Sequence, residues 1–100
     1  MIVPLSKIIL DNSIVNTVKK YGGTIKKGTL VNKEFTAPLN RMESSEYTQS
    51  PYEAMKKGIA LAPVVLEPYG TTGYYTIIEG RHRIASSIIL NYKGIHAIIK

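Results

Sequence analysis

The 100-residue chain contains no cysteine and no tryptophan. The absence of cysteine excludes disulfide bonds, thiolate metal sites and a cysteine nucleophile. It also fits a chain that folds in a reducing compartment, so we expect an intracellular, cytoplasmic protein. The uncharged apolar runs are far shorter than the roughly 20 residues that span a bilayer. The first residues carry neither a basic stretch nor a small-residue cleavage site, so we expect no membrane segment and no signal peptide.

Acidic residues are scarce relative to basic ones. Lysine and arginine number 13, aspartate and glutamate number 7, and the formal net charge is +6. A basic surface attracts polyanions, which favours a nucleotide or nucleic acid as the partner. The alternative is a charge that only keeps the chain in solution. Apolar residues make up 44% of the chain and charged residues only 20%, so we expect a single globular domain over residues 1–100.

The first half of the sequence predicts few regular elements. Branched residues favour a strand within residues 2–10. The run Asp-Asn-Ser at 11–13 supplies helix caps, so a helix is expected over 14–20, with two glycines at 22–23 as its stop. A hairpin about those glycines is the alternative. Residues 24–50 are expected to form a long surface loop with a short strand near 29–31, and long loops in small domains are often functional.

The second half has clearer patterns. Ser50 as N-cap, Pro51 and Glu53 in the first turn, and Gly58 as the stop predict a helix over 50–58 with a capping box. Two strands, 62–67 and 74–80, are expected to form an antiparallel hairpin about the turn Gly-Thr-Thr-Gly. An apolar face predicts a helix over 81–92, and a last strand follows over 95–100. These elements indicate a small α/β (α+β) domain with a mixed sheet packed against helices.

The junction between the second strand and the following helix is unusual in its charge. Gly80 can adopt a positive φ and lets a ligand approach the backbone. Arg81, His82 and Arg83 then place cations at a helix N-terminus, where each costs about 0.3–1 kcal/mol unless an anion compensates. Helix N-termini bind phosphate readily, so these four residues form a candidate anion site. The alternative is that both arginines face solvent, that Glu79 pairs with one of them, and that His82 is structural.

The stretch IIEGRHRIAS, residues 77–86, resembles the (D/E)-G-x-H/R-R-x-x-A signature of the ParB/sulfiredoxin-like superfamily. The flanking segments VPLSKI (3–8), SPYEAMKKGIALAPVVL (50–66) and GIHAIIK (94–100) resemble the opening strand, the preceding helix and strand, and the closing strand of these domains. The resemblance leaves residues 11–48 without a counterpart. It implies a small single-domain ParB/sulfiredoxin-like fold.

The resemblance also carries expectations about function. Arg81 stands where sulfiredoxins have the catalytic cysteine, so sulfiredoxin chemistry is excluded. In ParB-type domains this loop grips nucleotide phosphates, which implies that Gly80, Arg81, His82 and Arg83 bind phosphate, with Arg83 as the main ligand. The larger family members bind CTP and DNA and add a helix-turn-helix domain, for which 100 residues leave no room. The implied function is binding of nucleotide or nucleic-acid phosphate in a DNA-associated or regulatory role, with a nucleotide and Mg²⁺ as the candidate cofactor.

Two other classes of function stay open. The first is a metal-dependent nuclease or phosphotransferase on the same site, in which Glu79 would be the catalytic base or metal ligand. The second is an accessory protein with a degenerate site that acts through protein contacts. Whether the chain is an enzyme, and whether it forms a homo-oligomer, is left undecided.

Other candidate residues have simpler interpretations. Glu43 and Glu46 are expected to face solvent in the long loop, while Arg41 in the same loop is a candidate to reach a phosphate. His82 and His96 lie far apart in the sequence without metal-ligand spacing, so no metal site is expected. Tyrosines 69, 74 and 75 could stack on bases, although such residues more often pack in strands.

Overall fold

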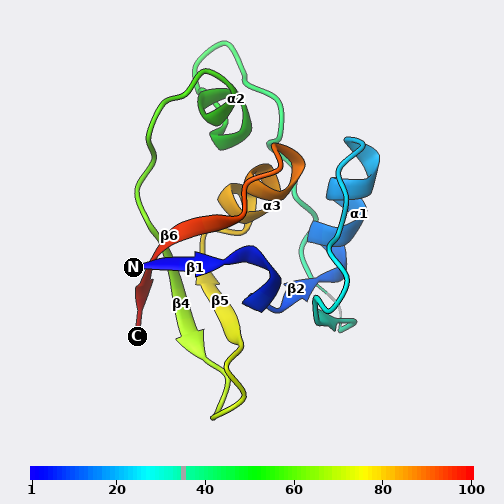
Figure 1. The fold of residues 1–100 in the computed structure, drawn as a ribbon. Coiled ribbons are helices and arrows are strands. Elements are labelled where there is room, and N and C mark those ends of the chain that lie inside the picture. Colours follow the sequence, from blue (N-terminus) through cyan, green and yellow to red (C-terminus); the bar gives the residue numbers. More distant parts are fainter. Residues whose placement is uncertain (35) are drawn as a thin grey trace.

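The computed structural model describes residues 1–34 and 36–100 and shows a small α+β domain (Figure 1). Four strands form a mixed sheet in the order β1-β6-β4-β5. Their bounds are Ile2–Pro4 (β1), Val64–Pro68 (β4), Tyr75–Glu79 (β5) and Gly94–Ile99 (β6). Strand β6 runs antiparallel to β1 and parallel to β4, and β4 pairs with β5 as the predicted antiparallel hairpin.

Three helices pack with this sheet. The central one, α3 (Arg81–Ile89), is the crossover that returns the chain from β5 to β6. Helices α1 (Asn12–Lys20) and α2 (Pro51–Lys56) both pack against α3 (Figure 1). Two residues of β2 (Leu10–Asp11) pair in parallel with β3 (Val31–Asn32), and a 3-10 turn, η1 (Leu5–Lys7), precedes them. The core is built from buried aliphatic side chains: Val3, Ile8, Leu10, Ile14, Val18, Val64, Leu66, Ile84 and Ala97.

The helix α1 begins where its capping residues predict. The Asp11 carboxylate accepts a hydrogen bond from the Ile14 amide at 2.9 Å, which satisfies one donor of the first turn. Ile14 and Val18 are fully buried and bring this helix onto the core. The hairpin alternative for this segment is therefore wrong.

The helix α2 has one of the two hydrogen bonds of the predicted capping box. Ser50 Oγ accepts from the Glu53 amide at 3.1 Å, as expected for an N-cap. The Ser50 amide, however, donates to Ser44 Oγ at 3.0 Å. The donor that Glu53 would have capped is thus already satisfied by the preceding loop, so the predicted reciprocal capping box is wrong.

The helix α3 ends earlier than predicted because Asn91, just beyond it, has a positive φ of 64° that a right-handed helix does not accommodate. The helix ends at Ile89 rather than at residue 92, and Tyr92 is 42% exposed instead of lying on the core face.

Ser86 and Ser87 are fully buried beside Ile84, and their hydroxyl groups donate to the carbonyls of His82 and Arg83 at 2.6 and 2.8 Å. A polar residue can therefore occupy the buried face because it is satisfied one turn back along the helix.

Strand β4 begins at Val64, which pairs with Ala97 of β6, rather than at residue 62, and the preceding Pro63 has no amide N–H to donate to a ladder. The carbonyl groups of Ala62 and Pro63 accept hydrogen bonds from Arg83. In the part of the chain that the structure describes, none of the helices has the length and apolar character needed to cross a bilayer.

Candidate anion-binding site

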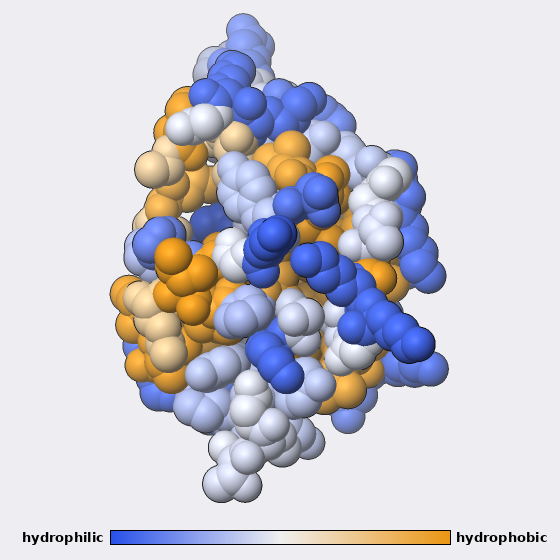
Figure 2. Space-filling model, in the orientation of Figure 1, coloured by the Kyte–Doolittle hydropathy of each residue, from blue (hydrophilic) through white to orange (hydrophobic). Residues whose placement is uncertain are grey.

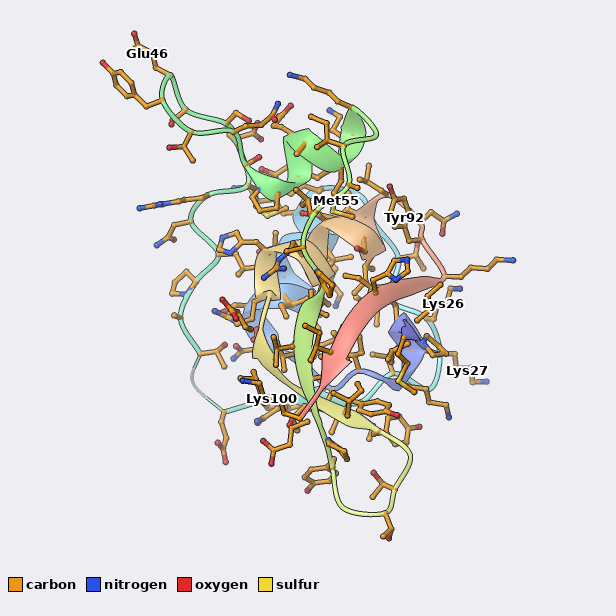
Figure 3. All side chains as sticks on the ribbon, turned by 90° about the vertical axis from the view of Figure 1, so that its left-hand side faces the viewer. Lys26, Lys27, Glu46, Met55, Tyr92 and Lys100 are labelled. Carbon is orange, nitrogen blue, oxygen red and sulfur yellow. The ribbon has the colours of Figure 1, made fainter. Side chains whose placement is uncertain are left out.

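An open cleft of about 880 Å³ lies at the first turn of α3. One wall consists of residues 80–83, and the other comes from the loop at 40–50 and from Pro51 at the start of α2. In Figure 3 this loop runs beside the first turn of α3, with Glu46 near its outer tip. The structure therefore brings the predicted Gly-Arg-His-Arg junction together with the long loop, whose role the sequence left undefined.

Gly80 has the left-handed backbone that its position requires, with φ of 111° and ψ of 29°. A Cβ atom here would lie 2.5 Å from Cγ1 of Val64, a fully buried strand residue. Glycine thus allows the strand to turn sharply into the helix against the core. The first amide groups of an α-helix have no intrahelical acceptor, and no side chain caps α3, so these amides add partial positive charge to this end of the cleft.

Arg81 is held by two acceptors of the protein itself. Its Nε donates to Oδ2 of Asp11 at 2.6 Å, and its Nη2 donates to the carbonyl oxygen of Ala37 at 2.6 Å. Burial raises the pKa of Asp11, but the hydrogen bonds from Arg81 and Ile14 and the charge of Arg81 outweigh it, so this pKa lies below 3.8. Asp11 therefore caps α1 and positions Arg81. The sequence predicted only the first of these roles.

Arg83 is also partly engaged. Its Nη1 donates to the carbonyl oxygens of Ala62 and Pro63 at 2.7 and 3.0 Å, which ties the segment before β4 to α3. Its Nη2 lies 3.3 Å from the place where a Cβ of residue 80 would be, so that nitrogen is beside the glycine turn. The arginine expected to be the main anion ligand thus has a structural task as well.

His82 carries a polar atom without a partner. Its Nε2 is buried and has no hydrogen-bond partner among the described residues. Burial lowers the pKa of His82 below 6.5, and the positive charges of Arg81 and Arg41 lower it further. A buried polar atom is normally hydrogen-bonded, so this unmatched nitrogen is an unusual feature of a residue that lines the cleft.

The loop supplies one cation and one carboxylate to the cleft. Arg41 is exposed, lines the cleft and acts electrostatically on His82. Glu43 also lines it but accepts a hydrogen bond from the Tyr21 hydroxyl at 2.7 Å. This hydrogen bond, together with some burial and the Glu43 charge, raises the pKa of Tyr21 to about 12. The Tyr21 ring meets the Tyr52 ring edge-on, with centroids 5.2 Å apart, so this cluster ties the loop to α1 and α2.

Glu79 does not pair with Arg81 or Arg83, contrary to the alternative interpretation of the junction. It ends β5 with an exposed side chain and is not among the residues that line the cleft. Within residues 1–34 and 36–100, the single ion pair is between Arg81 and Asp11, so the predicted pairing of Glu79 with an arginine is wrong. Its catalytic role stays a prediction.

The remaining candidates lie outside the cleft lining. Glu46 is exposed at the loop tip, Glu53 is in α2, and His96 is exposed on β6. Tyr69, Tyr74 and Tyr75 are near the β4–β5 hairpin and likewise do not line the cleft. No three histidine, aspartate or glutamate side chains in the described part of the chain gather closely enough to hold a metal ion.

Comparisons with known proteins add a fold relationship. No protein-family model matches the chain, and no curated protein matches it. A conserved hypothetical protein from Pyrococcus furiosus has a similar structure, with a TM-score of 0.57 and 16% sequence identity. The match covers 100% of this chain but only 31% of that protein, so the chain spans about a third of its length. At this identity the likeness shows the fold alone.

Proposed function

We propose that the chain is a ParB/sulfiredoxin-like domain whose cleft binds the phosphate groups of a nucleotide or of a nucleic acid. The observation that carries this proposal is the buried, unpartnered Nε2 of His82 at the uncapped N-terminus of α3. A phosphate oxygen in the cleft would accept from the amide groups beside it, and from Nε2 once the imidazole ring turns toward the cleft. The net charge of +6 also favours an anionic ligand.

The cations of the cleft have different tasks under this proposal. Arg41 is exposed on the loop and would move onto the anion as a direct ligand. Arg83 would contribute its Nη2 beside the glycine turn while its Nη1 keeps the segment before β4 in place. Arg81, fixed by Asp11 and Ala37, would act at short range through its charge. A bound anion would also compensate for the unfavourable positive charge at this helix end.

The scarcity of carboxylates among the described residues of the cleft favours a binding function over a metal-dependent enzyme. Glu43 is the single carboxylate among the described lining residues, and its side chain is already hydrogen-bonded to Tyr21. These residues do not fit a resident Mg²⁺, which prefers near-octahedral oxygen ligands. A magnesium ion would therefore have to arrive with a triphosphate and be held by the phosphate oxygens.

Calorimetric titration with pyrophosphate and with nucleoside triphosphates, with and without Mg²⁺, tests the proposal. We expect Arg41→Ala to weaken pyrophosphate binding by roughly tenfold, as expected for one lost charge-assisted hydrogen bond. Lys19→Ala is the matched control, because this exposed lysine lies on α1 and does not line the cleft. Absence of heat or of a melting-temperature shift at millimolar ligand in the unmodified protein would show that the cleft is not a phosphate site.

A further inference from the structure

The other end of α3 carries a second basic surface, formed by the exposed side chains of Lys7, Lys26, Lys27 and Lys93. We call it the lysine surface. Lys26 lines a small hollow together with Tyr92, the residue that directly precedes Lys93. In Figure 3, Lys26, Lys27 and Tyr92 lie on the side of α3 opposite to the loop at 40–50, which carries Glu46 and lines the cleft.

A tyrosine of the β4–β5 hairpin joins Lys7 to the same surface. The Tyr74 hydroxyl donates to the carbonyl oxygen of Gly28 at 3.4 Å, which brings the hairpin against the loop that contains Lys27. The Lys7 ammonium group lies 4.9 Å from the centre of the Tyr74 ring. Lys7 thus lies over the Tyr74 ring, and Lys26 lines the same hollow as Tyr92.

Negative charge is missing from the segments that build this surface. Residues 12–33 contain five lysines and no aspartate or glutamate, and residues 5–10, 69–75 and 91–94 are equally free of acidic residues. None of the four lysines belongs to an ion pair in the described structure. Figure 2 shows hydrophilic side chains that extend across the middle of the face on which β1 and the 3-10 turn lie in front. The surface therefore lacks an internal counter-charge.

We infer that the lysine surface binds single-stranded nucleic acid. The lysines match the phosphate backbone in charge, and the 42% exposed Tyr92 offers a ring on which an unpaired base can stack. A duplex would satisfy the charges but would keep its bases away from the ring. This surface is separate from the cleft, so the inference does not depend on phosphate binding at the N-terminus of α3.

The inference predicts a defined response to salt. Binding to single strands weakens with a slope of about 0.7 per phosphate contact on logarithmic axes. Three to four lysine contacts therefore predict a loss of roughly 20- to 50-fold in affinity between 50 and 200 mM salt. Removal of two lysines should lower the slope by about 1.4.

Fluorescence anisotropy with a labelled single-stranded 15-mer, its duplex and inorganic polyphosphate tests the inference. We expect Lys26→Gln/Lys27→Gln to weaken binding of the single strand by roughly tenfold at 50 mM salt. The matched control is Lys56→Gln/Lys57→Gln, which removes the same charge from two exposed lysines at the end of α2 and should change affinity by less than about threefold.

The contribution of the ring is tested by Tyr92→Leu against Tyr92→Phe. Loss of the ring should weaken single-strand binding by roughly fivefold or more, while duplex and polyphosphate binding stay unchanged and phenylalanine restores the affinity. Circular dichroism would verify that each variant is folded. The variant Lys26→Gln/Lys27→Gln should bind pyrophosphate in the cleft like the unmodified protein, because neither lysine lines the cleft, so failure of the cleft proposal and failure of this one are distinguishable.

Three results would overturn the inference. The first is absence of single-strand binding at low salt. The second is an equal loss in the two lysine-pair variants, which would mean that only the overall charge attracts polyanions. The third is an unchanged affinity in Tyr92→Leu, which would mean that the surface does not distinguish a nucleic acid from any other polyanion.

Discussion

The pair between Arg81 and Asp11 joins fold and site, and replacement of Asp11 separates its two tasks. Asparagine at position 11 keeps an oxygen that can cap α1 but removes the charge that holds Arg81. Alanine removes both. The side chains of Arg81 and Asp11 are only 27% and 12% exposed, so the pair is largely shielded from water, and its loss should cost more than that of a surface ion pair.

The magnitudes follow from the contacts. A hydrogen bond to a charged group contributes about 1.5–3 kcal/mol, and loss of an N-cap costs typically about 1 kcal/mol. Because some solvent reaches the guanidinium group, we expect Asp11→Asn to lower the free energy of unfolding by about 1.5 kcal/mol, near the lower end of the range for a charged hydrogen bond. For a domain of this size, about 1 kcal/mol corresponds to roughly 4–8 °C in melting temperature. Asp11→Asn should therefore melt roughly 6–12 °C lower, and Asp11→Ala roughly 4–8 °C lower still.

Thermal and urea unfolding of both variants, and of each combined with Arg81→Gln, provides the assay. The double-mutant cycle should give a coupling of about 1–2 kcal/mol between the two residues. Since the pKa of Asp11 is lowered in the folded protein, the pair contributes above pH 3.8 and its contribution is lost as the pH falls through the folded-state pKa. Additive effects of the two replacements, or an asparagine variant as stable as the unmodified protein, would refute the reasoning.

Three further predictions concern the cleft. Gly80→Ala should destabilise the fold by about 2–4 kcal/mol in urea unfolding, whereas Gly58→Ala, which has a positive φ but open space, should cost only about 1 kcal/mol. Glu43→Gln should lower the Tyr21 pKa from about 12 toward 10 in an ultraviolet titration, and an unchanged pKa would contradict the contact. Sulfate should bind more tightly as the pH falls below 6.5, because the pKa of His82 is lowered and a bound anion favours its protonated form, and His82→Asn should abolish this dependence.

The parts of the fold that follow local rules could be predicted from the sequence. The caps Asp11 and Ser50 mark the starts of α1 and α2, and the Gly-Thr-Thr-Gly turn at 70–73 between two apolar runs indicates the hairpin. These signals depend on residues within a few positions of one another, so the chain itself carries them. The same holds for Gly80, since its place between a strand and a helix with a charged first turn already indicates a left-handed turn.

The partners of the two arginines could not be predicted in the same way. Arg81 reaches Asp11 across 70 residues, and the Ala62 carbonyl that Arg83 binds is separated from it by 21 residues. Carbonyl groups occur at every position and carry no sequence signal, so no pattern identifies which of them an arginine will choose. Glu79 was the nearest carboxylate in sequence, but a strand directs its last side chain independently of the helix that follows.

This difference changes what the signature at the helix start implies. In the sequence alone, the Arg-His-Arg run suggests two equivalent arginines that are both available to bind an anion. In the structure, one arginine is fixed by a carboxylate and a carbonyl, and the other is divided between two carbonyls and the glycine turn. The group left unmatched is the histidine between them. The arginines therefore shape a positively charged cleft wall, and we expect any anion specificity to depend on His82 and on the loop that carries Arg41.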